Sequence, residues 1–369
     1  MFLFCEQILL DCLNWIFYEK ALMSLNTELL RKLCITPGAP GDEEKIRQIV
    51  RSEIESLVDK IEVDNMGNLI ALKKGSGDKK VMAAAHMDEI SFIITHIDKD
   101  GYARFHTLGG FDPKTLTSQR VIVHGKQDLI GVMGSKPIHL MTPEERNKAP
   151  RITDYFIDFG MKGDKVKEII SVGDKVTRER DMVELGDTYC TKSLDNRISV
   201  FILIETLKKI GTPAHDFYAV FTVQEEIGLR GATTATRYIN PDFGFGLDTT
   251  IANDLPSAQD HEKVTSLGAG TAIKIMDSSV VTDSRMVKFM KGVAKRHDIT
   301  WQPEILVGGG TDTGAMQRSG DGAIVGCISI PTRHIHSVVE MCHKEDIIGS
   351  IELLTRCVEE LDQFDYNWG

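Results

Sequence analysis

Apolar residues along this chain follow two spacings, one typical of helices and one typical of strands. Segments 42–58 and 283–297 carry them at helical spacing, and the short apolar runs 81–85 and 217–223 predict buried strands. Further elements are expected as helices at 26–34, 196–210 and 345–361, as strands at 243–247 and 322–330, and as a hairpin over 60–72. This alternation of helices and strands predicts an α/β domain with a three-layer α/β/α architecture.

The pattern changes between about residues 92 and 188. Helical spacing is nearly absent there, apart from a polar segment at 141–148, and turns containing Gly and Asp separate short β-prone runs. These runs are 103–107, 119–124, 129–133, 155–158 and 174–178. We therefore expect a small β-barrel-like domain inserted into the α/β domain. The predicted division is an N-terminal extension at 1–22, the α/β domain at 23–92 and 188–369, and the inserted domain at 93–187.

The N-terminal extension fits neither a signal peptide nor a membrane anchor. Glu6 and Asp11 interrupt its apolar residues, no basic residue precedes them, and no small-residue cleavage site follows. A spanning helix needs about 20 nearly uncharged residues. Met23 is a candidate for the true start, because ordinary helix patterning begins directly after it.

Composition narrows the range of partners and compartments. The 369 residues are 42% hydrophobic and 26% charged, as in soluble globular proteins. A net charge of −11 without a long lysine or arginine run argues against a nucleic-acid partner, and no membrane partner is expected. The seven cysteines are odd in number and scattered without a CxxC pair, which favours a reducing, cytoplasmic environment.

Potential metal ligands stand at the ends of the predicted strands or at helix starts of the α/β part. They are His86, Asp195, the pair Glu225 and Glu226, Asp248, and the segment from His334 to His336. Each alone has an ordinary explanation, such as a structural histidine, a charge at a helix start, a turn residue or a solvated surface. Together they favour a binding site, because ligands of open α/β sheets bind outside the carboxyl ends of the strands.

The types of these residues indicate a pair of divalent cations. Mixed imidazole and carboxylate ligands suit Zn²⁺ or Co²⁺ better than Mg²⁺ or Ca²⁺. Five ligands exceed the three of a single catalytic zinc and match two metals that share one carboxylate. Asp88 lies two residues beyond His86, on the same face of an extended segment, where it can accept a hydrogen bond from the imidazole. Glu225 is then available as a general base for a water activated by the metals.

The glycine-rich segment 308–314 has two readings. It contains no phosphate-binding motif, and HExxH, GxSxG, P-loop and Rossmann motifs are absent from the chain. A flexible loop and a loop whose backbone approaches a substrate closely both remain open.

With these residues placed, the chain resembles the tetrahedral (TET-type) dinuclear metalloaminopeptidases, a family that includes glutamyl and deblocking aminopeptidases. The similarity spans roughly residues 25–361, and the matching motifs occur in the family's order throughout. The motifs are 85–90 (AHMDEI), 193–197 (SLDNR), 224–232 (QEEIGLRGA), 246–248 (GLD), 309–312 (GGTD) and 331–337 (PTRHIHS), with TPEER at 142–146 and IDFG at 157–160 in the insert.

The resemblance implies a role for each matching residue. His86 and Asp248 would bind one metal, Glu226 and His336 the other, and Asp195 would bridge them. Glu225 would be the general base and later the proton donor to the leaving amine, and Asp88 would orient His86. The peptide bond after Asp195 is expected to be cis. The substrates would be peptides with a free N-terminus.

The resemblance also implies how the chain assembles. The inserted domain would mediate dimerisation, and six such dimers would form a hollow homo-oligomer, a dodecamer. Two features depart from the family pattern. Ser91 stands where the family usually has glycine, and the extension at 1–22 has no counterpart, which leaves assembly beyond the dimer open.

Two other functions remain open at this point. A glycoside hydrolase of the endoglucanase type also uses paired carboxylates, about 5–9.5 Å apart and without metal. A non-catalytic, metal-stabilised assembly protein is the second alternative, and the presence of Glu225 argues against it, since a scaffold needs no spare base. The N-terminal residue that the enzyme prefers and its physiological metal do not follow from the sequence.

Overall fold

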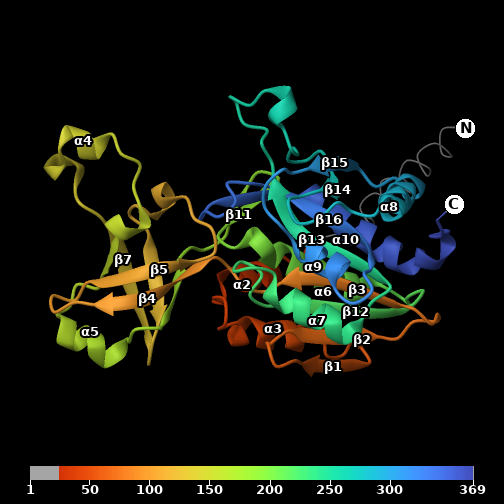
Figure 1. The fold of residues 1–369 in the computed structure, drawn as a ribbon, viewed down its shortest axis with the longest axis horizontal. Coiled ribbons are helices and arrows are strands. Elements are labelled where there is room, and N and C mark those ends of the chain that lie inside the picture. Colours follow the sequence, from red (N-terminus) through yellow and green to blue (C-terminus); the bar gives the residue numbers. More distant parts are fainter. Residues whose placement is uncertain (1–24, 369) are drawn as a thin grey trace, which may run out of the picture.

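The computed structural model describes residues 25–368, so the predicted extension at 1–22 lies outside the described residues. Two parts lie side by side in Figure 1, a large mixed sheet covered by helices and a smaller barrel. This arrangement confirms the predicted fold class.

The large sheet has eleven strands. Nine of them run in the order β1-β2-β12-β3-β13-β16-β17-β11-β10, and β14 and β15 extend from β16. Strands β12, β3, β13 and β16 are mutually parallel and form its centre. The bounds are β1 Lys60–Val63, β2 Leu69–Lys73, β3 Lys80–His86, β10 Val183–Leu185, β11 Thr188–Thr191, β12 Asp216–Thr222, β13 Phe243–Ile251, β14 Thr271–Met276, β15 Trp301–Ile305, β16 Ile324–Arg333 and β17 Glu340–His343.

Helices cover both faces of this sheet (Figure 1). One face packs against α2 Thr27–Ile35, α3 Glu44–Ile54, α6 Leu194–Lys209, α8 Ser284–Arg296 and α10 Lys344–Glu359, and the other against α7 Arg230–Ile239 and α9 Asp312–Arg318. The alternation of side chains explains the two cores. In β3, Val81, Ala83 and Ala85 belong to the first core, whereas Met82 and Ala84 belong to the second.

The smaller part is a closed six-stranded barrel with a core of its own. Its strands occur in the order β4-β5-β8-β7-β6-β9 around the barrel. They are β4 Ser91–Ile97, β5 Ala103–Leu108, β6 Arg120–His124, β7 Asp128–Gly134, β8 Phe156–Asp158 and β9 Lys175–Arg178. Buried residues such as Phe92, Val121 and Ile157 fill it. Sequence patterning missed β4 and the helix α5 at Gly163–Ile169.

Two central strands are longer than the sequence predicts. Strand β13 was expected to end at Leu247 and β16 at Ile330, but they continue to Ile251 and Arg333. They stay paired in parallel register from Phe243 opposite Ile324 to Ile251 opposite Thr332. The predicted end of β13 was wrong because Asp248 was taken as a turn residue, whereas it lies within the ladder opposite Ser329.

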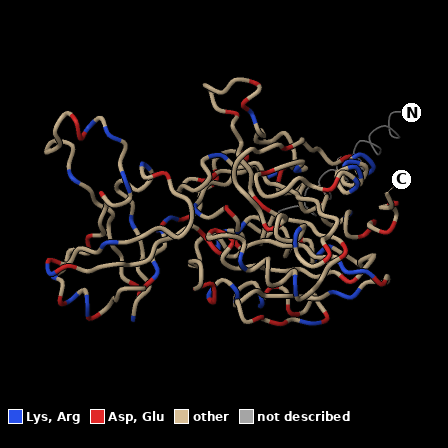
Figure 2. The backbone as a smooth tube through the Cα atoms, in the orientation of Figure 1, with Lys and Arg blue, Asp and Glu red and all other residues tan. Residues whose placement is uncertain are grey.

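Charged residues of both signs are interspersed over the described chain (Figure 2). None of the helices between residues 25 and 368 combines the length and apolar character that crossing a membrane requires.

Candidate metal centre

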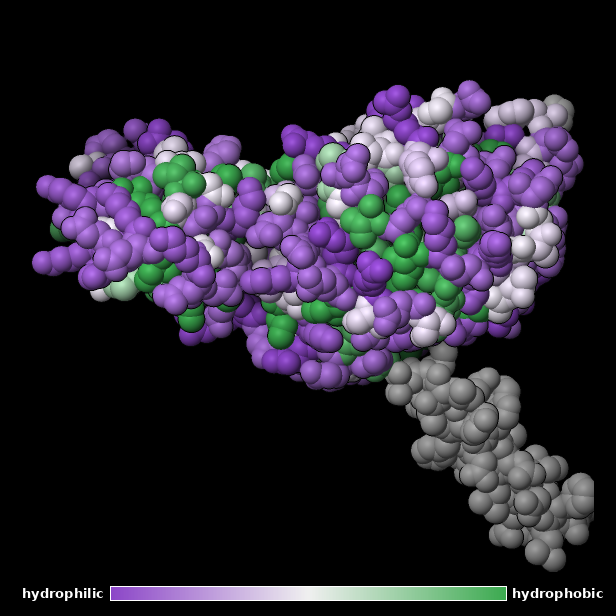
Figure 3. All heavy atoms as spheres, turned by 90° about the horizontal axis from the view of Figure 1, so that it is seen from below, coloured by the Kyte–Doolittle hydropathy of each residue, from purple (hydrophilic) through white to green (hydrophobic). Residues whose placement is uncertain are grey.

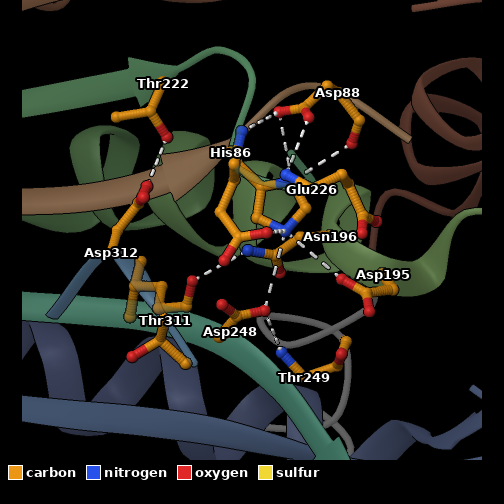
Figure 4. Close-up of polar contacts among 12 residues, drawn as sticks. His86, Asp88, Asp195, Asn196, Thr222, Glu226, Asp248, Thr249, Thr311 and Asp312 are labelled. Atoms are coloured by element: carbon orange, nitrogen blue, oxygen red, sulfur yellow. Dashed lines mark hydrogen bonds and ion pairs between the residues drawn. The ribbon is translucent and has the colours of Figure 1, made fainter. Parts of the chain in front are cut away.

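The candidate ligands converge at one edge of the large sheet, where the parallel central strands end. His86 is the last residue of β3, and Glu225 and Glu226 follow shortly after the end of β12 at Thr222. His336 lies in the loop directly after β16, and Asp195 opens α6. Figure 4 shows the side chains of His86, Asp195 and Asp248, which come from different elements, pointing toward one another. The expectation that one edge of the sheet would collect them therefore agrees with the structure.

Two clusters of possible ligand atoms share one carboxylate. In the first, His86 Nε2 lies 3.3 Å from Asp195 Oδ1 and 3.8 Å from Asp248 Oδ1. In the second, His336 Nε2 lies 3.3 Å from Asp195 Oδ2 and 3.6 Å from Glu226 Oε2. The two oxygens of Asp195 thus face different clusters, as a bridging ligand requires. His334 belongs to neither cluster.

The spacing and chemistry of these atoms fit divalent cations. Ligands about 2.0–2.2 Å from a tetrahedral zinc lie roughly 3.4 Å from each other, close to the distances in both clusters. Glu226 Oε1 is buried without a hydrogen-bond partner among the described residues, and a cation would satisfy this oxygen. The residues present therefore fit the metals that the sequence implies.

The charges of the site act strongly on one another. Burial raises the pKa of Glu226 to about 8, and the nearby Asp195 carboxylate acts in the same direction. Burial opposes protonation of His336, but its hydrogen bond with Asp195 and the charge of Glu226 raise its pKa to about 9. The site thus holds several carboxylates close together. Two bound cations would offset the repulsion among their negative charges.

Asp88 supports the site in a way that the sequence did not reveal. Its carboxylate oxygens accept hydrogen bonds from the backbone N–H groups of Glu225 and Glu226, at 3.0 and 3.1 Å. His86 Nδ1 lies 3.1 Å from the backbone oxygen of Asp88 and 3.5 Å from its carboxylate. The predicted contact with His86 therefore involves the carbonyl more closely than the carboxylate, which instead fixes the turn that carries the glutamate pair.

Glu225 belongs to neither of the two clusters, although it lies beside the first one. Its Oε2 is 3.7 Å from His86 Nε2, and its side chain lines the cavity above the ligands. Burial and the neighbouring carboxylates, chiefly Asp248, raise the pKa of Glu225 well above its usual value, although His86 opposes the shift. A carboxyl group in such a position can accept and return a proton.

Glu340 was missed by sequence reasoning. It is buried at the start of β17, and its two oxygens accept hydrogen bonds from the backbone N–H groups of Asp195 at 2.9 Å and His336 at 2.8 Å. Arg178 of the barrel donates a hydrogen bond to the His336 carbonyl at 3.1 Å. Glu340 therefore holds the backbone of two ligand segments, and Arg178 also holds that of His336. A polar residue four positions after His336 in a β-prone run was the available signal.

Asp312 is a further buried carboxylate near the site and belongs to neither cluster. Thr222 at the end of β12 donates a hydrogen bond to it at 2.5 Å (Figure 4). Burial raises the pKa of Asp312 to about 7. The peptide bond between Asp195 and Asn196 is cis, as the resemblance implied.

A cavity of about 580 Å³ opens beside the ligands. Gly308, Gly309 and Gly310 line it together with Leu306 and Ile335. This position agrees with the substrate-facing reading of the glycine-rich segment.

This fold and its two histidine–carboxylate clusters are those of a metal-dependent hydrolase. The family model of the M42 glutamyl aminopeptidases matches residues 67–353. The chain therefore belongs to this family, and it is an aminopeptidase, as predicted.

Known relatives agree over nearly the whole chain. The lysyl aminopeptidase of Pyrococcus furiosus is 34% identical over 92% of this chain and 98% of its own length. The TET aminopeptidase of a marine-sediment Thaumarchaeota archaeon superposes with a TM-score of 0.88 at 34% identity, covering 91% of this chain and 96% of that one. The TET1 peptidase of Pyrococcus horikoshii, which assembles into a tetrahedron or an octahedral shell, gives 0.82 at 32% identity, covering 90% and 99%.

Proposed function

We propose that this aminopeptidase removes N-terminal residues from peptides with two divalent metal ions per subunit, Zn²⁺ or Co²⁺. His86 and Asp248 would hold one ion, Glu226 and His336 the other, and Asp195 both. The observation that carries this proposal is the division of the Asp195 oxygens, each 3.3 Å from a different histidine. When bound, the cations would polarise the scissile carbonyl and acidify a water molecule.

The chain's own residues supply the proton transfers and the alignment. Glu225 faces the cavity without belonging to a ligand cluster, so its carboxylate is free to take the proton of the attacking water. The same group would then return the proton to the leaving amine. Asp88 would keep Glu225 and Glu226 pointing in different directions, because it binds both of their backbone N–H groups.

Replacing the two glutamates one at a time tests this division of roles. Glu225→Gln should lower kcat by about 10²–10⁴-fold at full metal loading, because the proton acceptor is lost. Glu226→Gln, the matched variant, should instead lose metal. The measurements are hydrolysis of aminoacyl-nitroanilides and metal content per subunit. Wild-type turnover by metal-loaded Glu225→Gln would refute the assigned role.

A chelator separates this proposal from a metal-free glycosidase. Activity should disappear on chelation and return with Zn²⁺ or Co²⁺. Activity that survives complete metal removal would contradict the proposal.

The same proposal includes homo-oligomers and a cytoplasmic location. The barrel carries exposed apolar side chains on and after β7, namely Ile130, Val132, Ile138 and Leu140, and Figure 3 shows hydrophobic groups on the barrel within a hydrophilic surface. Such groups mark association surfaces. We infer a dimer through the barrel, with dodecamers built from it.

The five cysteines of the described residues are buried and free, which suits a reducing compartment.

A further inference from the structure

The cavity beside the ligand clusters has a single charged residue outside the centre itself. Among its lining residues in the described chain, Lys274 alone carries charge apart from Glu225 and the ligands. The remaining wall is apolar, hydroxylic or glycine, and it includes Leu229, Thr250, Ile251, Leu306, Gly308, Gly309 and Ile335.

The charge of Lys274 is already paired beneath the cavity. Its Nζ lies 2.5 Å from Glu304 Oε1 and 3.4 Å from Asp277 Oδ2, and all three side chains are fully buried. Strand pairing builds this contact, because Lys274 of β14 lies opposite Glu304 of β15 in the parallel register. Thr250 donates a second hydrogen bond to the same Glu304 oxygen at 2.6 Å.

Stability alone does not account for an ion pair at this position. A buried pair costs about as much in desolvation as it returns, and apolar residues of similar volume often replace such pairs without loss. Here Lys274 of the pair lines the cavity beside the ligand clusters, so the charge of the pair acts on any side chain that enters this cavity.

Three kinds of N-terminal side chain would meet different conditions in this cavity. A basic side chain would approach the ammonium of Lys274, and an acidic one would find that ammonium already compensated by two carboxylates. Both would also lose their hydration. A neutral apolar side chain loses no strong hydration and contacts residues such as Leu306 and Ile335.

We propose that the Lys274–Glu304 pair makes this cavity select neutral, apolar N-terminal residues over acidic or basic ones, with Glu304 masking Lys274 from acidic substrates. The proposal rests on the aminopeptidase function proposed above and on this cavity receiving the side chain of the N-terminal residue. Both strand residues then determine specificity through the charge they present, without contacting the reacting atoms.

Leucyl, glutamyl and lysyl p-nitroanilides at fixed metal loading test the selection. The wild type should show the highest kcat/KM for leucyl, by about tenfold or more over either charged substrate. Glu304→Gln removes the negative charge that compensates Lys274 and keeps a hydrogen-bond acceptor for Thr250. The ratio of glutamyl to leucyl kcat/KM should therefore rise about tenfold. Glu55→Gln, the same change at an exposed position of the chain, should leave the ratio unchanged.

The reciprocal variant sharpens the test. Lys274→Gln leaves Glu304 and Asp277 without their cation, so the lysyl-to-leucyl ratio should rise instead. A purely structural role would lower all three activities alike and leave both ratios unchanged, which would overturn the proposal.

The ranking of the three kcat/KM values in the wild type tests the proposal even if both variants fail to fold. Turnover with a preference for glutamyl or lysyl substrates would overturn this inference alone. Absence of turnover of all three substrates by the metal-loaded protein would overturn the proposed function and this inference with it.

Discussion

At the scale of single residues, the metal centre depends on backbone groups held by buried carboxylates. Asp88 binds the N–H groups of Glu225 and Glu226, and Glu340 binds those of Asp195 and His336. Four of the proposed site residues are thus anchored through their main chain. Such supporting contacts orient metal ligands, and the loss of one typically lowers metal affinity about 10–100-fold.

Glu340→Gln tests this anchoring. The amide has one acceptor oxygen, so its NH₂ group would face one of two backbone N–H donors that Glu340 now satisfies. We expect the affinity for Zn²⁺ or Co²⁺ to fall about 10–100-fold. Calorimetric metal titration measures this loss.

A matched control separates the effect from a general change of charge. Glu345→Gln alters an exposed residue of α10 five positions later and should bind metal as the wild type does. Unchanged affinity in folded Glu340→Gln would show that Glu340 does not position the ligands.

Sequence reasoning found the ligand candidates and Asp88, but not the other residues that support them. His86, Glu226 and His336 could be predicted because they follow apolar runs that end at one edge of a parallel sheet. Glu340 and Asp312 could not, because their importance depends on partners 145 and 90 residues away in the chain. Local spacing carries no information about such contacts.

At the scale of elements, the end of β12 is tied to the loop before α3. Glu43 is 3% exposed, and its Oε1 accepts hydrogen bonds from the N–H groups of Gly41 at 2.8 Å and Gln224 at 3.2 Å. Burial, assisted by the charge of Asp88, raises the pKa of Glu43 to about 7 from a usual 4.5. The Glu43 carboxylate therefore joins the two elements, and its contribution to the free energy of unfolding depends on pH.

Glu43→Gln should therefore stabilise the protein at alkaline pH. A carboxyl group with a raised folded-state pKa favours the native state while protonated, and this advantage is lost as pH rises from about 4.5 through 7. The amide keeps an acceptor and carries no charge. The variant's Tm should match the wild type near pH 4.5 and exceed it at pH 8, by an amount equivalent to roughly 2–3 kcal/mol.

Thermal unfolding at a fixed metal concentration across that pH range measures the difference. A gap in Tm that is constant with pH would show that Glu43 does not titrate as described.

Elements were predicted better in type than in extent. Apart from α7 and α9, which no predicted range covers, the α-helices and the four central strands of the α/β part occur where apolar spacing placed them. Their ends moved because pairing decides where a strand stops, as at β13, and because Asp195 and Asn196 at the start of α6 adopt non-helical backbone angles. The short α5 and β4 of the insert lacked a spacing signal of their own.

At the scale of the whole molecule, the barrel takes part in the site. Arg178 of β9 binds the His336 carbonyl, and Gly110, which follows β5, lines the cavity. An inserted domain that touches both a ligand segment and the cavity can couple assembly to activity, if association occurs through the barrel.

The exposed apolar residues of β7 provide the test of that association. Ile130 and Val132 are 60% and 47% exposed and alternate with the buried Gly131 and Met133, so they point outward from the barrel. A double Ile130→Glu, Val132→Glu variant would place two like charges per subunit in a desolvated interface. We expect a lower molar mass than the wild type by light scattering after size-exclusion chromatography.

Val63→Glu on β1 makes the same type of change at a residue that is 43% exposed on the edge of the large sheet. Its mass should equal that of the wild type, which separates loss of a specific interface from a general effect of added charge. If the double variant keeps the wild-type mass while remaining folded, this face of the barrel is not the dimer contact. If the mass falls and the activity at full metal loading falls with it, the Arg178 contact offers the physical route, because loosening the barrel would release the backbone of His336.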